Sequence, residues 1–195
     1  MCYKVYTLTC AMLLSGDPSH EAHVLNDAGL LQTPSTDANK RTRFRAVTRN
    51  PEALQDRLGP LEFVDVVKGE LSPAGCSSGD LDHILEGAQR VFLCLPQGLS
   101  SADMVSVSKS VTDACKKAGV ELMVRISSAR IDAYLSNHKI PSQGPLGEAH
   151  VTGETYTKDA GIKLTSIRPT SFSTNFAAYD LPNIKATSTF ASPLG

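Results

Sequence analysis

Apolar residues cluster along this chain in short runs separated by longer amphipathic stretches, a pattern that predicts strands alternating with helices. Strand-like runs cover residues 44–48, 61–67, 90–96, 120–126 and 162–167, and helical spacing covers residues 102–118 and 146–160. The run over residues 90–96 is almost continuously apolar, which is typical of a strand buried on both faces of a parallel sheet. Strands that alternate with helices through short connections predict right-handed βαβ units. We therefore expect an α/β fold of Rossmann type, with a doubly wound parallel sheet in three layers.

Turn-forming residues mark the ends of several of these elements. Asn50 and Pro51 have the order of a cap and a first helical residue, so a helix is expected to begin there. Gly119 and Gly161 follow the two long helical stretches and are expected to end them. Residues 79–87 predict a capped short helix that ends at glycine, and a Gly/Ser-rich stretch precedes it.

The N-terminal region has a weaker pattern. Residues 5–14 are apolar and are interpreted as the first strand, with a secretory signal as the alternative because Ser15-Gly16 resembles a cleavage site. Residues 20–31 predict a short helix, and residues 33–39 predict a loop. The whole chain of 195 residues is long enough for one domain with a sizeable core.

Composition narrows the possible partners. Hydrophobic residues make up 41% and charged residues 20%, which is ordinary for a globular protein, and the net charge is −1. We expect no nucleic-acid partner, since no basic stripe is present, and no membrane partner, since no run reaches the ~18 apolar residues of a spanning helix. The five cysteines are odd in number and include no C-x-x-C pair, so we expect reduced thiols and a cytoplasmic protein.

The segment over residues 161–176 carries the clearest resemblance to a known family. Glycine ends a helix, a short apolar strand follows, Arg168-Pro169 interrupts it, and small polar residues come next. This segment resembles the last strand and substrate wall of NmrA-like proteins, atypical short-chain dehydrogenase relatives that bind NAD(P). Residues 45–51 and 92–96 resemble the second and fourth strands of that family. The resemblance implies a single NAD(P)-binding domain over residues 1–195, with residues 1–42 atypical and the C-terminal substrate region incomplete.

The same resemblance implies an oxidoreductase that transfers hydride to a small carbonyl, quinone or iminium-like acceptor. It assigns cofactor contacts to the ends of the strands, namely Thr48, Arg49, Leu95, Pro96, Ser127, His150, Pro169 and Thr170. Arg49 is expected to meet the 2′-phosphate, which favours NADP with NAD possible, because a guanidinium fork fits a phosphate; a surface arginine is the alternative. Phe172 and Asn175 are expected to bind the small-molecule substrate.

Two residues are candidates for a catalytic role. Ser127 falls at the serine position of the wider dehydrogenase superfamily, where a hydroxyl can bind a substrate carbonyl; a turn or capping serine is the alternative. The Tyr-x-x-x-Lys pair of related oxidoreductases falls on Leu146 and His150, so the tyrosine is absent and histidine replaces lysine. Glu154 lies one helical turn after His150 and is expected to orient it, either for chemistry or as a structural pair. Tyr134 does not align with either position of the Tyr-x-x-x-Lys pair.

The first turn departs from the family pattern. Relatives carry Gly-x-x-Gly-x-x-Gly after the first strand, which lets backbone N–H groups approach the pyrophosphate. Here Cys10, Met12 and Leu13 occupy that stretch, and no glycine precedes Gly16. Weak cofactor binding is therefore expected. The alternatives are a non-catalytic NADP-sensing module with a protein partner, or a degenerate fragment without either activity.

Overall fold

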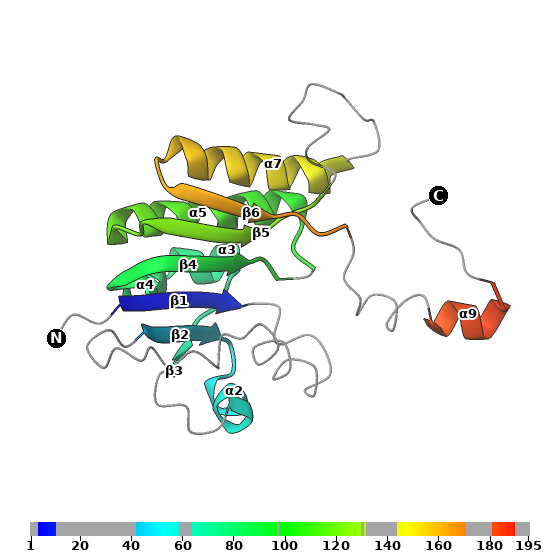
Figure 1. The fold of residues 1–195 in the computed structure, drawn as a ribbon, viewed down its shortest axis with the longest axis horizontal. Coiled ribbons are helices and arrows are strands. Elements are labelled where there is room, and N and C mark those ends of the chain that lie inside the picture. Colours follow the sequence, from blue (N-terminus) through cyan, green and yellow to red (C-terminus); the bar gives the residue numbers. More distant parts are fainter. Residues whose placement is uncertain are drawn as a thin grey trace.

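The computed structural model describes residues 4–10, 42–58, 64–96, 98–129, 131, 144–170 and 181–189. These residues form a six-stranded sheet in the order β3-β2-β1-β4-β5-β6 (Figure 1). The strands are β1 (Lys4–Cys10), β2 (Thr42–Thr48), β3 (Val64–Lys68), β4 (Ala88–Cys94), β5 (Leu122–Ile126) and β6 (Lys163–Ile167). Every neighbouring pair is parallel, so the carboxyl ends of all strands meet at one edge. The order reverses between β1 and β4, where open α/β sheets bind their ligands.

Helices lie between these strands and after the last of them. They are α2 (Pro51–Leu58), α3 (Pro73–Ser77), α4 (Asp80–Leu85), α5 (Ser101–Ala118), α7 (Gly144–Asp159) and α9 (Leu181–Thr187). Helix α5 contacts α3, α4 and α7, so these four helices form one layer, whereas α2 contacts β2 and β3. The Rossmann-type parallel sheet is thereby confirmed. The third layer stays a prediction, because most of the connection between β1 and β2 lies outside the described residues.

Local sequence signals account for most element ends. Asn50 accepts a hydrogen bond from the N–H of Ala53 at 3.2 Å, which confirms it as the cap of α2. Gly119 and Gly161 both have positive φ, 73° and 84°, which places them in the left-handed region as helix ends require.

Helix α3 and the start of α4 differ from the prediction. The Gly/Ser-rich stretch contains α3, whose cap Ser72 accepts a hydrogen bond from Gly75 N at 3.0 Å. Helix α4 begins after Gly79 with no side-chain cap, so the expected capped helix lacks that feature. The helix expected over residues 20–31 and the loop over residues 33–39 lie outside the described residues.

The core lies between the sheet and the layer that contains α5. Val91 and Leu93 of β4 are 1% exposed, and Val107 and Cys115 of α5 are fully buried, as the apolar pattern predicted. Cys76, Cys94 and Cys115 are buried and are not in disulfides. Burial raises the pKa of Cys115 to about 12, so this thiol stays protonated and inert at neutral pH.

Strand β6 is less buried than its apolar sequence suggested. Ile162 is buried just before the strand, but Ile167 at its end is 45% exposed. Its place in the sheet explains this difference, since β6 is the last strand in the described order and has a strand partner on one side only. Within the described part of the chain, no helix has the length and apolar character needed to cross a membrane.

Candidate functional site

The carboxyl ends of β5 and β6 bring together segments that lie far apart in the sequence. The N–H of Ser127, just after β5, donates to the carbonyl of Ile167 at 2.8 Å. Two residues later the N–H of Ala129 donates to the carbonyl of Pro169 at 3.2 Å. Helix α7 packs against β6 and carries His150. The predicted residues Ser127, His150 and Pro169 therefore belong to three segments that meet at the ligand-binding edge of the sheet.

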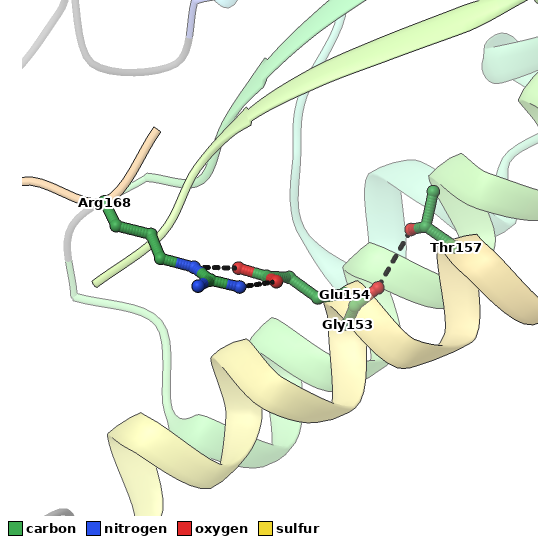
Figure 2. Close-up of polar contacts among 4 residues, drawn as sticks. All are labelled: Gly153, Glu154, Thr157 and Arg168. Carbon is green, nitrogen blue, oxygen red and sulfur yellow. Dashed lines mark hydrogen bonds and ion pairs between the residues drawn. The ribbon is translucent and has the colours of Figure 1, made fainter. Parts of the chain in front are cut away.

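A buried carboxylate on α7 binds the segment that follows β6. Glu154 is 1% exposed, and its oxygens accept from Arg168 through Nε at 3.3 Å and Nη2 at 2.6 Å (Figure 2). Burial alone would raise the pKa of Glu154, but the Arg168 guanidinium and the hydroxyls of Ser127 and Ser166 lower it below its usual value. Glu154 is therefore ionised at neutral pH, and it holds α7 to the start of the segment that contains Pro169.

This arrangement corrects the role expected for Glu154. The sequence suggested that its carboxylate would pair with His150 on the same helix face. In the structure it binds Arg168 instead, and His150 Nδ1 is buried with no hydrogen-bond partner among the described residues. The physical reason is the bidentate geometry, because a guanidinium gives a carboxylate two charge-assisted hydrogen bonds.

A second guanidinium lies beneath α7. Arg125 on β5 is fully buried, and its Nη2 donates to Ser108 Oγ at 3.4 Å. It occupies space left by Gly153, since a Cβ there would lie 2.5 Å from Nη1 and 2.9 Å from Nη2. Burial lowers the pKa of Arg125 to about 10, although attraction to Glu154 opposes the shift. Arg125 therefore carries a positive charge at neutral pH.

His150 is neutral in this environment. Burial lowers its pKa to about 4, repulsion from Arg125 acts in the same direction, and Glu154 acts against both. A neutral imidazole has one donor and one acceptor nitrogen, so it can donate a hydrogen bond to a hydroxyl group or accept one from it. It cannot supply the cationic charge that lysine brings to this position in the related oxidoreductases.

Unpartnered polar atoms gather in the same place. Among the described residues, the buried side-chain nitrogens and oxygens without a hydrogen-bond partner are Arg125 Nε, Arg125 Nη1, Ser127 Oγ and His150 Nδ1. Ser127 Oγ faces the Glu154 carboxylate without the geometry of a hydrogen bond to it. Among the residues that the structure describes, no side-chain hydrogen bond of Ser127 supports the capping role considered for it. Buried polar groups are normally paired, so these four atoms are exceptions within the part of the chain that the structure describes.

At the ends of β2 and β3, where the adenine side of the cofactor is expected, the structure places exposed cationic side chains. Thr48 is 3% exposed, and its hydroxyl accepts from Asn50 N at 3.1 Å, so it shapes the turn after β2. Arg49 follows it and is exposed. Lys68, the last residue of β3, is the register partner of Thr48 and is also exposed. Two cationic side chains therefore stand at neighbouring strand ends, where the sequence had indicated only Arg49.

The remaining predicted contacts differ in how far the structure describes them. Leu95 and Pro96 follow β4 and are half-buried, and Thr170 is exposed after Pro169. The substrate candidates Phe172 and Asn175 lie outside the described residues, as does Tyr134.

The sequence reasoning missed Arg125 and the space left by Gly153. A signal was present for both, since an arginine within an apolar strand and a glycine within a helix each break the local pattern.

A parallel sheet of this order, with polar groups gathered at its carboxyl edge, defines a dinucleotide-binding α/β protein. The chain belongs to the NAD(P)H-binding family, whose model matches residues 32–191. The family expected from the sequence is thereby confirmed. The match begins after β1 and the glycine-poor stretch that follows it.

Solved structures with the same fold include two reductases and an epimerase. Triphenylmethane reductase of Citrobacter sp., complexed with NADP(H), is 17% identical, with a TM-score of 0.63 over 95% of this chain and 55% of that one. An NADPH-dependent quinone oxidoreductase of Escherichia coli is 20% identical, with a TM-score of 0.64 over 93% and 54%. A nucleoside-diphosphate-sugar epimerase of Staphylococcus aureus is 17% identical, with a TM-score of 0.67 over 98% and 59%. The chain thus spans little more than half the length of these proteins.

Proposed function

We propose that this protein is an NADP-dependent oxidoreductase of NmrA-like type that reduces a small carbonyl, quinone or iminium-like acceptor. The observation that supports this most is the gathering of unpartnered Ser127 Oγ and His150 Nδ1 at the carboxyl edge of a sheet of the NAD(P)H-binding family. The reduced nicotinamide, when bound, would supply the hydride. The chain's own residues would bind, orient and polarise the acceptor.

Each part of the edge has a role in this proposal. Arg49 and Lys68 would bind the 2′-phosphate, and Leu95 and Pro96 would pack against the ribose and pyrophosphate. Pro169 and Thr170 would line the nicotinamide end, with Phe172 and Asn175 beyond them as the substrate wall.

No tyrosine acid is available at the helix position where relatives carry one. Leu146 occupies it and is 56% exposed. Ser127 would therefore donate to the acceptor, and the neutral imidazole of His150 would hold a ribose hydroxyl or the substrate.

Cofactor titration tests this proposal directly. The purified chain should bind NADPH more tightly than NADH, as measured by the fluorescence of the reduced nicotinamide. Arg49→Ala should lose roughly tenfold or more in NADPH affinity, because a hydrogen bond to a charged group contributes about 1.5–3 kcal/mol. Lys117→Ala serves as the control, since Lys117 lies on α5 and the substitution removes a positive charge from its exposed ion pair with Asp82 of α4. Equal affinities for NADPH and NADH would contradict the phosphate-binding role proposed for Arg49.

A non-catalytic NADP-sensing module is the second candidate. The absence of glycine between Cys10 and Gly16 favours it, because side chains there oppose close approach of a pyrophosphate. This candidate predicts NADPH binding with no NADPH oxidation by neutral quinones, aldehydes or cationic dyes. Measurable turnover with any of these acceptors would exclude it.

A further inference from the structure

We propose that Cys10 and Cys94 form a redox-sensitive pair at the dinucleotide-binding edge of the sheet, and that their oxidation to a disulfide weakens NADPH binding. Cys10 is the last residue of β1, and Cys94 is the last residue of β4. The strand order reverses between these two strands, and open α/β sheets bind their ligands at that point. The disulfide itself does not depend on the proposed function, whereas its effect on NADPH binding rests on it.

The register of the sheet makes the two cysteines neighbours. After a single shift near the start of β1, the pairing with β4 runs unbroken to the strand ends, where Cys10 is the register partner of Cys94. Successive residues of a strand alternate between the two faces of a sheet, so partners in an unshifted register lie on the same face. Neighbouring strands are about 4.7–4.9 Å apart, and a disulfide joins residues whose Cα atoms are about 4.4–6.8 Å apart. The backbone therefore permits this bridge.

Closing the bridge would change the edge of the sheet. The Cβ atoms of a disulfide are about 3.5–4.5 Å apart, which is closer than the spacing of neighbouring strands. The ends of β1 and β4 would therefore have to approach each other. Disulfides that strain the structure around them are the labile ones, and they are typical of regulatory sites. We therefore expect a bridge that a reductant opens readily.

The oxidation balances with hydrogen peroxide as the oxidant. The thiolate of one cysteine attacks a peroxide oxygen, the O–O bond breaks, and a sulfenic acid forms while the departing hydroxide takes up a proton and becomes water. The thiolate of the other cysteine attacks that sulfur, the S–O bond breaks, and the S–S bond forms with release of a second water. The two thiols together lose two electrons and two protons. Cys94 is 3% exposed, so we expect Cys10 to react with peroxide first and Cys94 to close the disulfide.

The bridge would act on the cofactor through the segments that follow the two strands. In dinucleotide-binding sheets the turn after the first strand receives the pyrophosphate, and here that turn begins at Cys10. Leu95 and Pro96, which would pack against the ribose and pyrophosphate, follow Cys94. A covalent bond between the strand ends constrains both segments at once. Because coupling between two binding events is reciprocal, a bound cofactor should also oppose formation of the disulfide.

Peptide mapping after peroxide treatment tests the bridge. Trypsin cuts after lysine and arginine, so each of the five cysteines falls in a different tryptic peptide, with Cys10 in residues 5–40 and Cys94 in residues 91–109. Reduced protein would be treated with hydrogen peroxide and blocked with N-ethylmaleimide, and the monomer from a non-reducing gel would be digested for mass spectrometry. We expect these two peptides to be linked and dithiothreitol to separate them. No linked peptides, or another cysteine pair as the main product, would overturn the proposal.

The NADPH affinity of the same samples tests the regulation. Oxidised protein should bind NADPH about tenfold or more weakly than reduced protein, within the roughly 5–150-fold range of coupled sites, and dithiothreitol should restore the affinity. Saturation with NADP beforehand should slow the appearance of the linked peptides.

Cysteine variants identify the thiols that matter. Cys94→Ser should lose both the linkage and the effect of peroxide on NADPH affinity. Cys76→Ser is the matched control and should keep both, because Cys76 lies on α3 and burial raises its pKa, so little of it is the reactive thiolate. A Cys94→Ser protein that still loses NADPH affinity with peroxide would contradict the proposal. If Cys94→Ser does not fold, Cys10→Ser decides in the same way.

Failure of the inference can be told apart from failure of the proposed function. Linked peptides with an unchanged NADPH affinity overturn the regulatory role and leave the proposed function intact. Reduced protein that does not bind NADPH overturns both the proposed function and the regulatory role, while the peptide map still decides whether the disulfide forms.

Discussion

Replacement of Glu154 by glutamine should destabilise the protein strongly. The substitution replaces the buried carboxylate that Arg168 binds with a neutral amide. Breaking a fully buried ion pair from one side costs about 3–5 kcal/mol. The Arg168 side chain keeps 22% exposure, so water recovers part of that energy, and we expect a loss of about 2–4 kcal/mol. For a chain of this size, such a loss lowers Tm by roughly 5–15 °C.

Thermal and urea unfolding would measure this effect. Glu148→Gln is the matched control, because Glu148 is exposed on the same helix and should leave Tm nearly unchanged. A double-mutant cycle with Arg168→Met isolates the pair, and we expect a coupling energy within the ~0.5–3 kcal/mol found for contacting residues. A Tm for Glu154→Gln within about 1 °C of the wild type, or strictly additive effects in the cycle, would refute the reasoning.

The pH dependence gives a second view of the same pair. The folded state lowers the pKa of Glu154, so its carboxylate stabilises the fold at pH values above the ordinary unfolded value of about 4.3. That contribution should disappear as the pH falls through the lower pKa of the folded state. Glu154→Gln should lack this part of the acid dependence, and a variant with the same acid profile as the wild type would contradict it.

Three further outcomes follow from the same structure. If there is turnover, His150→Ala should lower kcat/KM by about tenfold or more, as expected for one lost hydrogen bond, whereas Tyr134→Phe should change little. Steady-state kinetics on variants with matched Tm values would measure both effects. An active His150→Ala together with an inactive Tyr134→Phe would contradict the alignment of His150 with the lysine of the Tyr-x-x-x-Lys pair. Gly153→Val should lower the free energy of unfolding by about 1–3 kcal/mol, because its side chain would meet the Arg125 guanidinium, and urea unfolding that shows no loss would contradict this. Cys115 should resist a thiol reagent at pH 8 until the protein unfolds, and rapid labelling of the native protein would contradict its raised pKa of about 12.

The sheet could be predicted from the sequence because the strands are short segments rich in apolar and β-branched residues, and parallel pairing follows from the helices between them. Helix α3 could not, since Pro73, Gly75 and the serines around them have the composition of a loop, and only the cap at Ser72 and tertiary packing make it helical. Periodicity carries no information about such a short helix.

The site was predictable where a residue's role depends on its own segment. Ser127 and Pro169 follow strands, so parallel pairing alone brings them to one edge. The partner of Glu154 was not predictable in this way, because helical spacing reveals neighbours on the same helix, such as His150, whereas Arg168 lies just after the next strand. The position of Arg125 depends on the missing side chain of Gly153, a contact between a strand and a helix that no local pattern encodes.

These contacts suggest how the site works with a histidine in place of lysine. A lysine at this position would bring a positive charge to the ligand, whereas His150 is neutral at physiological pH. The positive charge lies instead in Arg125, which is fully buried beneath the helix and is itself one reason why His150 stays neutral. A ligand would then contact an uncharged imidazole while it remains in the field of a guanidinium that it does not touch. Since salt screens buried charges much less than exposed ones, the effect of Arg125 on His150 should persist as the ionic strength rises.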